Sequence, residues 1–509
     1  MRILFFIAKF ESHLRVFEPP VREMIRRGHS VHFVRTRSED GKAVGAVDNL
    51  AREFPALSWS DAPIDVHDPW ATVRDRVRRA QDYVRYVAEG YPDDSNPLIR
   101  TARRRVPADV RDLLDRHLVG SRRQLRSRIL HRALRSALHA MPVPPATRDY
   151  IAAQDPDVVV VAPSFLLGLV GDQETVRAAQ ELSVPTALCV ASWDNLRHRQ
   201  LIDCDPHVTL VWNDVQRQEA IEVHGLPADR VVATGAQVYD QWFDRRPSDR
   251  AAFCERAGLP DDRPFVLYVG GALFSRTMTE SQFVERWVAA LRASLRPELR
   301  DTAVLVRPHP SRIRDLGAVD LDAYPGVSVW PRHDQMPVAH AAKQDFFDSL
   351  HHSAAVVGVN TSAMIEAGIA GKRVFAVLVP ELSESQFETL HFRYLTQAGG
   401  GLLRVAELAE HLDDLANTLS GAGDPAEENR PFLEAFVRPH GLHVPATPMF
   451  VDAIERVAAT RPKPVRSGPA ELALRWAFEP LRVAYELEHG RAHRRRMIRA
   501  RLARNATEL

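Results

Sequence analysis

One stretch of the sequence constrains the fold more than any other: residues 354–379, AAVVGVNTSAMIEAGIAGKRVFAVLV. Apolar residues at 354–359 predict a buried strand, the polar residues 360–362 predict a helix start, and Gly371-Lys372 predicts the helix end before another apolar strand. This order is one βαβ unit of an open parallel sheet. In such a sheet ligands bind at the carboxyl edge of the strands, where a helix amino end suits a phosphate.

The polar residues of this unit have two interpretations. Thr361 and Ser362 either hold a phosphate or serve only as helix caps. Glu366, one helical turn beyond Ser362, either faces the same edge and accepts hydrogen bonds from ribose hydroxyls or is a solvated helix residue.

The βα alternation runs through most of the chain in two series. The first contains predicted strands at 3–8, 29–35, 157–162, 185–191, 208–213 and 230–235, and the second contains strands at 265–271, 303–306, 327–330 and 354–359. Two such series predict two doubly wound Rossmann-like domains facing a cleft, an α/β fold. We expect a first domain over 1–235, a second over 236–460 and a helical tail over 461–509.

A helical insertion is predicted inside the first domain, at about 70–145. The segment is charged and poor in β-branched residues, and Pro142, Pro144 and Pro145 close it. Helices are also expected over Leu14–Arg27 and near Val405–Leu419.

The length and overall charge set broad limits. At 509 residues the chain exceeds what one hydrophobic core usually supports. Lys and Arg number 67 against 66 for Asp and Glu, so the overall charge predicts no nucleic-acid partner. Arginine is concentrated in two places, Arg100–Arg135 and Arg491–Arg504. Both are interpreted as solvated helix faces, with contact to an anionic membrane surface or to a polyanionic acceptor as the alternative.

The cysteines and apolar runs indicate a cytoplasmic protein. The three cysteines are an odd number without Cys-x-x-Cys spacing, which argues against a disulfide framework and a structural zinc site. The opening ILFFIA is too short for a signal peptide, and no run approaches the length of a membrane span. We expect a cytoplasmic location. Peripheral association with the inner face of the membrane is left open.

Two common nucleotide motifs are missing. No Gly-x-Gly-x-x-Gly follows the first strand, where the sequence reads AKFESHLR, so a dinucleotide oxidoreductase is disfavoured. The Gly371-Lys372 pair is no P-loop, because Arg373 replaces the Ser or Thr and the pair ends a helix. We expect no metal and no cofactor.

Two further strand exits in the second domain carry candidate binding residues. Arg307 and His309 follow an apolar strand in the run RPHP, and both can donate to phosphate oxygens. Gly270-Gly271 closes another strand, and the missing side chains would let a phosphate or sugar approach the backbone. The alternatives are a rigid turn with an exposed His and plain turn chemistry.

The first domain offers two candidate bases at its strand exits. His13 lies in Glu11-Ser12-His13, and Asp194 lies in Ser192-Trp193-Asp194-Asn195. Either could deprotonate an acceptor hydroxyl within hydrogen-bond distance, with His309 acting on the donor side. Loop caps are the alternative for both segments.

The layout, RPHP (307–310) and NTSAMIEAGIAGKRV (360–374) resemble the GT-B glycosyltransferase fold. They most resemble bacterial surface-polysaccharide enzymes of the CDP-glycerol glycerophosphotransferase and capsule Kdo-transferase group, over about residues 150–420. The resemblance implies that the second domain binds the donor nucleotide. Its implied donor residues are Arg307, His309, Thr361, Ser362 and Glu366. GVNTSAMIEA differs from the TDYSS-type sequence of the glycerophosphotransferases, which leaves the donor open.

The resulting hypothesis is a metal-independent transferase. It would move a sugar or phosphopolyol unit from a nucleotide-sugar or CDP-polyol donor to a saccharide or lipid-linked acceptor in envelope polysaccharide biosynthesis. Two alternatives share the fold: an epimerase of the UDP-N-acetylglucosamine 2-epimerase type, and a non-catalytic nucleotide-binding component of polysaccharide assembly.

Overall fold

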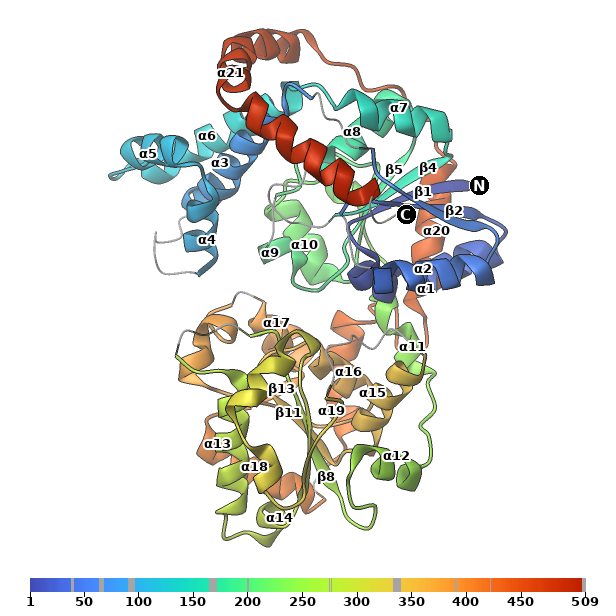
Figure 1. Ribbon diagram of the computed structural model, residues 1–509, viewed down its shortest axis with the longest axis vertical. Coiled ribbons are helices and arrows are strands. Elements are labelled where there is room, and N and C mark those ends of the chain that lie inside the picture. The colour runs from blue at the N-terminus through green and yellow to red at the C-terminus, as the bar shows by residue number, and fades with distance from the viewer. Residues whose placement is uncertain are drawn as a thin grey trace. The chain divides into compact units, whose positions relative to one another are not determined.

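The chain forms two compact units in a computed structural model (Figure 1). The structure describes residues 1–37, 41–63, 68–89, 97–163, 172–198, 201–273, 275, 277–332, 340–389, 391–421 and 423–505. Unit 1 contains Met1–Thr234 together with Thr447–Leu509, and unit 2 contains Gly235–Ala446.

The centre of unit 1 is a parallel sheet with the strand order β3-β2-β1-β4-β5-β6-β7. Its strands are β1 (Arg2–Ile7), β2 (Ser30–Arg35), β3 (Leu57–Asp61), β4 (Val158–Ala162), β5 (Thr186–Cys189), β6 (Val208–Val211) and β7 (Val231–Ala233). The central strand β4 reads VVVVA and is fully buried, as expected for a parallel strand covered on both faces.

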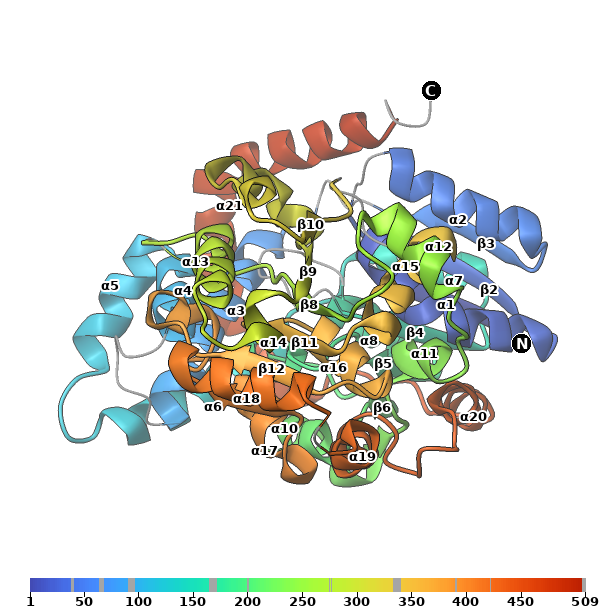
Figure 2. The same cartoon turned by 90° about the horizontal axis from the view of Figure 1, so that it is seen from below.

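Helices cover this sheet, and α1 and α2 lie side by side against β2 and β3 (Figure 2). The helices of unit 1 are α1 (Phe10–Arg26), α2 (Gly41–Glu53), α3 (Ala71–Glu89), α4 (Pro97–Arg105), α5 (Ala108–His117), α6 (Arg123–Ala140), α7 (Pro145–Gln154), α8 (Asp172–Glu181), α9 (Asn195–His198), α10 (Asp214–Glu222), η1 (Ala228–Arg230), α20 (Ala446–Ala458) and α21 (Pro469–Asn505).

The predicted helical insertion corresponds to α3–α6. Its core is a buried cluster that includes Tyr83, Val84, Ile99 and Leu114. Polar bonds join it to the rest of unit 1, since Arg78 donates to Glu174 at 2.5 Å and Gln81 donates to Asp203 at 2.6 Å.

Unit 2 contains a second parallel sheet, with the order β10-β9-β8-β11-β12-β13. Its strands are β8 (Phe265–Val269), β9 (Ala303–Arg307), β10 (Val327–Val329), β11 (Ala355–Gly358), β12 (Val374–Val377) and β13 (Leu403–Ala406). The apolar side chains of β8, β9, β11 and β12 pack with α13 and α18 into one buried core.

The helices of unit 2 connect these strands. They are η2 (Gln237–Tyr239), α11 (Asp240–Phe243), α12 (Arg250–Ala257), α13 (Glu280–Arg292), α14 (Pro297–Arg300), η3 (Pro310–Ala318), η4 (Leu321–Ala323), α15 (His340–His352), α16 (Ala363–Ile369), η5 (Pro380–Ser385), α17 (Phe392–Gln397), η6 (Ala398–Gly400), α18 (Leu408–Leu419) and α19 (Pro425–Phe436).

The two ends of unit 2 are bonded to each other. Asp240 Oδ1 accepts from Arg438 Nη2 at 2.8 Å and from the backbone N–H of Ala446 at 3.1 Å. A Cβ on Gly235 would lie 2.6 Å from that of Ala446, which explains the glycine at this close approach. The chain therefore enters and leaves unit 2 at neighbouring points.

Three expectations differ from the structure. Helix α20, inside the range 236–460 assigned to the second domain, belongs to unit 1, where Arg27 donates to Asp452 at 2.6 Å. The helix expected near Val405 begins at Leu408, because Val405 continues β13. Strand β3 was not predicted, since LSWSD is a short edge strand with mostly half-exposed residues.

Candidate functional site

Each sheet has one point at which the chain reverses its direction of strand addition. In unit 2 the chain adds β9 and β10 on one side of β8 and then returns to place β11 on the other side. In unit 1 it adds β2 and β3 beside β1 and then returns to β4. Loops leaving such neighbouring strands diverge and open a crevice at the carboxyl edge. These two places are called the β8/β11 and β1/β4 switch points below.

Gly270 and Gly271 lie at the β8/β11 switch point, between two other strand exits. A Cβ on Gly270 would lie 2.7 Å from the backbone nitrogen of His309, and a Cβ on Gly271 would lie 2.6 Å from the Asn360 carbonyl oxygen. Close approach of three backbones therefore explains both glycines. The candidates that follow β9 and β11 are brought to the same edge as this pair.

Neither backbone N–H of the glycine pair points outward. The Gly270 N–H donates to the Arg307 carbonyl at 2.8 Å, and the Gly271 N–H donates to Glu280 Oε2 at 2.9 Å. The glycine pair can therefore leave room for a ligand at this edge only through its missing side chains. Hydrogen bonds to a phosphate have to come from other groups.

Glu280, the first residue of α13, holds the loop that follows β8 from the interior of unit 2. Its other carboxylate oxygen accepts from the Tyr268 hydroxyl at 3.0 Å. Burial raises the pKa of Glu280 to about 7, although the Gly271 N–H and the Tyr268 hydroxyl act in the opposite direction. Sequence reasoning missed this residue, because only the packed structure brings α13 behind the glycine pair.

His309 caps η3 after the strand β9. The Ser311 backbone N–H donates to His309 Nδ1 at 3.2 Å, so in the neutral ring the proton resides on Nε2. The Ser311 hydroxyl lies 2.9 Å from the same Nδ1. The imidazole is half-buried and is oriented with Nε2–H as its hydrogen-bond donor.

Arg307 is held mainly by the interior of unit 2. Its guanidinium lies 5.2 Å from the ring centroids of both Trp330 and Phe346, and Nη1 donates to the Ser349 hydroxyl at 3.0 Å. Burial lowers the pKa of Arg307 to about 10. These contacts join β9 to α15, so a phosphate contact would have to use its remaining N–H groups.

Thr361 and Ser362 precede α16 and are half-buried. Ser362 occupies the N-cap position of α16, yet its side chain makes no capping hydrogen bond to the described residues. The capping interpretation therefore does not account for the serine. Next to it, Asn360 donates to the Ser385 carbonyl at 2.8 Å, while its buried Oδ1 accepts no hydrogen bond within the described ranges.

Glu366 lies in the interior of unit 2. Its side chain is 1% exposed, which excludes the interpretation as a solvated helix residue. Gln386, also missed by sequence reasoning, donates to the Val359 and Val377 carbonyls at 3.0 and 2.8 Å and so fixes the exits of β11 and β12. Its position in the chain carries no signal, because the bonds depend on tertiary packing alone.

His13 lies in the first turn of α1, at the β1/β4 switch point of unit 1. Its Nδ1 is 3.0 Å from the Lys9 carbonyl oxygen, an obligate acceptor, so Nδ1 carries the proton and Nε2 carries the lone pair. The side chain is 7% exposed, and Nε2 has no hydrogen-bond partner within the described residues. Burial lowers the pKa of His13 to about 4, while the Lys9 and Ala162 carbonyls oppose this shift.

Asp194 lies at the same sheet edge, after β5. The Ser192 hydroxyl donates to Asp194 Oδ1 at 2.6 Å, and Asn195 Nδ2 donates to the same oxygen at 3.5 Å. Because β4 separates β1 from β5, His13 and Asp194 belong to loops two strands apart. These local bonds match the loop-cap alternative.

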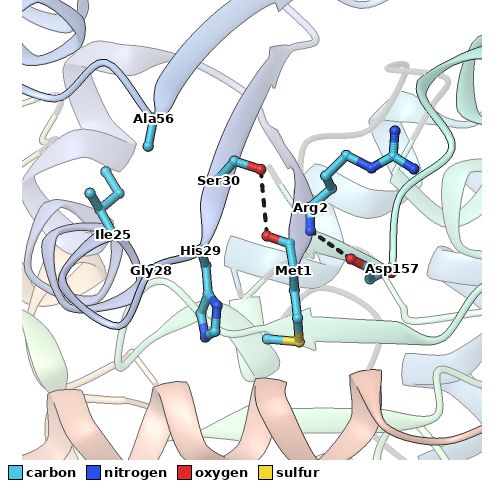
Figure 3. A pocket seen from close by; sticks show the side chains of 8 residues that line it. All are labelled: Met1, Arg2, Ile25, Gly28, His29, Ser30, Ala56 and Asp157. Carbon is cyan, nitrogen blue, oxygen red and sulfur yellow. Dashed lines mark hydrogen bonds between the residues drawn. The ribbon is translucent and has the colours of Figure 1, made fainter.

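A different hollow opens at the opposite edge of the unit 1 sheet (Figure 3). Met1, Arg2, Ser30 and Asp157 line it at the amino ends of β1, β2 and β4, and the Arg2 N–H donates to Asp157 at 2.7 Å. Ligands of open parallel sheets bind at the carboxyl edge, so this hollow does not match the predicted site. Within the described ranges, no group of three or more His, Cys, Asp and Glu side chains is placed to hold a metal ion.

The sequence matches no protein-family model and no curated protein significantly. Its structure is similar to a glycosyltransferase from Rickettsia africae, with a TM-score of 0.50, 10% identity and coverage of 90% of this chain and 99% of that chain. It is also similar to S. aureus MnaA bound to UDP, with a TM-score of 0.50, 13% identity and coverage of 92% and 100%. A putative UDP-N-acetylglucosamine 2-epimerase from Listeria monocytogenes has a TM-score of 0.50, 13% identity and coverage of 92% and 99%.

These similarities and the two parallel sheets confirm the predicted fold class, an α/β chain of two doubly wound GT-B-type domains. At 10–13% identity they concern the fold alone. None of these three proteins is described as a CDP-glycerol or Kdo transferase, so that finer resemblance stays a prediction.

Proposed function

We propose that the chain is an enzyme acting on a nucleotide-activated sugar or related polyol, and that it transfers the activated unit to an acceptor hydroxyl. The observation that carries the proposal is the β8/β11 switch point. There the glycine pair brings the His309 turn and the Asn360–Ser362 turn together at one sheet edge.

The chemistry of this edge suits a departing nucleoside diphosphate. Cleavage of the donor develops negative charge on the leaving phosphate, and groups that bind this charge more tightly in the transition state accelerate the reaction. His309 Nε2–H and the Thr361 and Ser362 hydroxyls would donate to the phosphate oxygens. Glu366 is 1% exposed, so it would reach a ribose only after the residues that cover it move.

The acceptor would bind at unit 1. A histidine with Nδ1–H held by a carbonyl and a lone pair on Nε2 can take the proton of an acceptor hydroxyl. His13 has this arrangement, and its lowered pKa keeps it neutral at pH 7. Asp194 is the second candidate, with its carboxylate oriented by Ser192.

The metal-independent character and the cellular context are parts of the same proposal. We expect EDTA to leave turnover unchanged, since His309 and the hydroxyls would compensate the phosphate charge. An envelope saccharide or lipid-linked acceptor and a cytoplasmic location follow from the resemblance to surface-polysaccharide enzymes.

The first test is nucleotide binding measured by thermal shift. CMP, CDP, UDP, GDP and ADP are compared, with UDP first because the similar S. aureus protein binds it. A ligand at about a hundred times its dissociation constant adds roughly 2.7 kcal/mol of stability. His309→Ala should lower the affinity about tenfold or more, whereas His340→Ala, which removes an exposed histidine of unit 2, should not. Equal affinity for both variants and the wild type would remove His309 from the site.

An epimerase is the second candidate, favoured by the structural similarity to a putative UDP-N-acetylglucosamine 2-epimerase. The two reactions differ in their need for an acceptor. An epimerase converts the nucleotide sugar alone, and NMR of the sugar ring would detect the new isomer. A transferase leaves the sugar unchanged until an acceptor is added. A protein that binds nucleotide and does neither would be the non-catalytic alternative.

A further inference from the structure

Helix α21 exposes a row of large apolar side chains. Leu472, Trp476, Val483 and Leu487 are 43%, 78%, 41% and 80% exposed. At 100° per residue these four positions lie within about 60° of one another around the helix axis. They are called the α21 stripe below. An exposed apolar row on one helix face is unusual for a surface that meets only water.

The opposite side of α21 is already packed. Phe478 and Tyr485 contact the buried cluster around Trp70 and Val73, and Arg475 donates to the Ala140 carbonyl at 2.9 Å. Helix α21 therefore docks on α3 and α6 through one face and presents the α21 stripe on the other. Packing within the described part of unit 1 does not bury the stripe.

Positive charge follows the stripe along the chain. Residues 491–504 include seven arginines, and no acidic residue occurs between 489 and 507. Glu479 and Glu486, which precede this segment, both pair with Arg482. Two of the acidic groups of the helix are thus paired locally, and the net charge of its second half is strongly positive.

We propose that α21 binds an anionic lipid bilayer, lying in the plane of its surface. The α21 stripe would enter the headgroup region, where Trp prefers to lie, and the arginine segment would bind lipid phosphates. Neither signal suffices by itself, because stable attachment of a surface helix needs apolar burial together with charge attraction. Within the described residues no helix is long and apolar enough to cross a membrane, so the contact is peripheral.

Charge complementarity favours a bilayer over a second copy of the chain. A second copy docked on the stripe would bring two arginine-rich segments together, and like charges repel at this density. An anionic surface attracts the same segments, and each arginine near it adds to the binding. This inference stands apart from the proposed function, because it uses no residue of either switch point.

Vesicle co-sedimentation of the full chain tests the proposal. We expect binding to vesicles of phosphatidylcholine with about one-third phosphatidylglycerol, weak binding to pure phosphatidylcholine, and loss of binding at high salt. Trp476→Ser with Leu487→Ser should lower the affinity for the anionic vesicles about tenfold or more. Both side chains are mainly exposed, so the variant should unfold at the wild-type temperature.

Two controls place the contact on α21. Leu295→Ser removes an apolar side chain that is 93% exposed in unit 2 and should leave binding unchanged. Leu125→Ser with Ile129→Ser alters α6, where these side chains are 58% and 61% exposed, and should have the smaller effect. The proposal is overturned if the wild type does not bind anionic vesicles, or if the α6 variant loses binding while the α21 variant keeps it. It is also overturned if the only effect of the α21 variant is to convert a dimer into a monomer.

Discussion

The two switch points share one topology but carry different chemistry. At the β8/β11 switch point of unit 2, three backbone segments pack closely around Gly270 and Gly271. The polar groups there include the Thr361 and Ser362 hydroxyls, the donating His309 imidazole and the buried Glu280 carboxylate that holds Gly271. At the β1/β4 switch point of unit 1, the buried His13 imidazole donates from Nδ1 to the Lys9 carbonyl and holds a lone pair on Nε2. One edge suits an anion, and the other suits proton transfer.

The difference shows that the same strand order does not fix the function of its edge. Topology determines where loops diverge, while the residues at the strand ends determine what is bound or transferred there. Each unit can therefore be tested separately, with variants that affect one edge and leave the other intact.

The largest effect is expected from removal of the His13 lone pair. His13→Asn keeps a donor near the Lys9 carbonyl but lacks Nε2, so turnover should fall about a hundredfold or more while nucleotide affinity stays unchanged. Steady-state kinetics and nucleotide titration measure the two quantities. His32→Asn, at a half-buried histidine of the same sheet, is the control. Equal turnover of the two variants would contradict a proton-transfer role for the β1/β4 edge.

The two edges should also respond to pH with opposite signs. The folded pKa of His13 is lowered from 6.5 to about 4, so the unfolded chain binds the proton more readily and stability falls as the pH drops from 6.5 towards 4. The folded pKa of Glu280 is raised from 4.5 to about 7, so stability falls as the pH rises from 4.5 towards 7. Each contribution changes by roughly 1.4 kcal/mol per pH unit within its window.

Denaturant unfolding of two variants over pH 4–8 separates these contributions. Relative to wild type, His13→Asn should flatten the acidic loss of stability, and Glu280→Gln should flatten the loss on approach to neutral pH. Parallel stability curves for wild type and both variants would show that these groups titrate alike in the folded and unfolded chain.

A smaller effect is expected from crowding the glycine pair. Gly271→Ala places a Cβ 2.6 Å from the Asn360 carbonyl oxygen, so unit 2 should lose about 1–3 kcal/mol of unfolding free energy. Gly317→Ala is the matched control, because its Cβ would meet no atom within 4 Å. Chemical denaturation measures both, and equal stability of the two variants would argue against close packing at this edge.

The smallest stability effect is expected at Ser362. Because its side chain caps nothing among the described groups, Ser362→Ala should change the unfolding free energy by less than about 0.5 kcal/mol and yet weaken nucleotide binding about tenfold. Thr279→Ala is the contrast. Thr279 forms a capping box with Gln282 at the start of α13, so its loss should cost about 1 kcal/mol and leave nucleotide affinity unchanged. A reversed pattern would restore the capping interpretation of Ser362.

Much of the architecture could be predicted from the sequence, because buried parallel strands appear as short, continuous apolar runs. Residues 157–162 and 354–359 correspond to β4 and β11, and the strand ends then place His13, His309 and Ser362 at carboxyl edges. Edge elements were harder to predict, as β3 shows, because half-exposed strands lack this pattern.

The internal chemistry of the site could not be predicted. That Arg307 packs between two aromatic rings, that Glu280 holds Gly271 and that Ser362 makes no cap all depend on which elements pack together. The spacing of residues along the chain does not reveal those contacts. The sequence therefore predicted which residues lie at the sheet edge better than it predicted their hydrogen-bond partners.

The bonded ends of unit 2 have a consequence for synthesis. Unit 1 is split by 212 residues of inserted chain, Gly235–Ala446, and receives α20 and α21 last. Because the ribosome synthesises the chain from its amino end, all of unit 2 is made before the final helices of unit 1 emerge. During translation the sheet of unit 1 therefore stays partly uncovered until α20 is made and Phe450 can pack against Phe17.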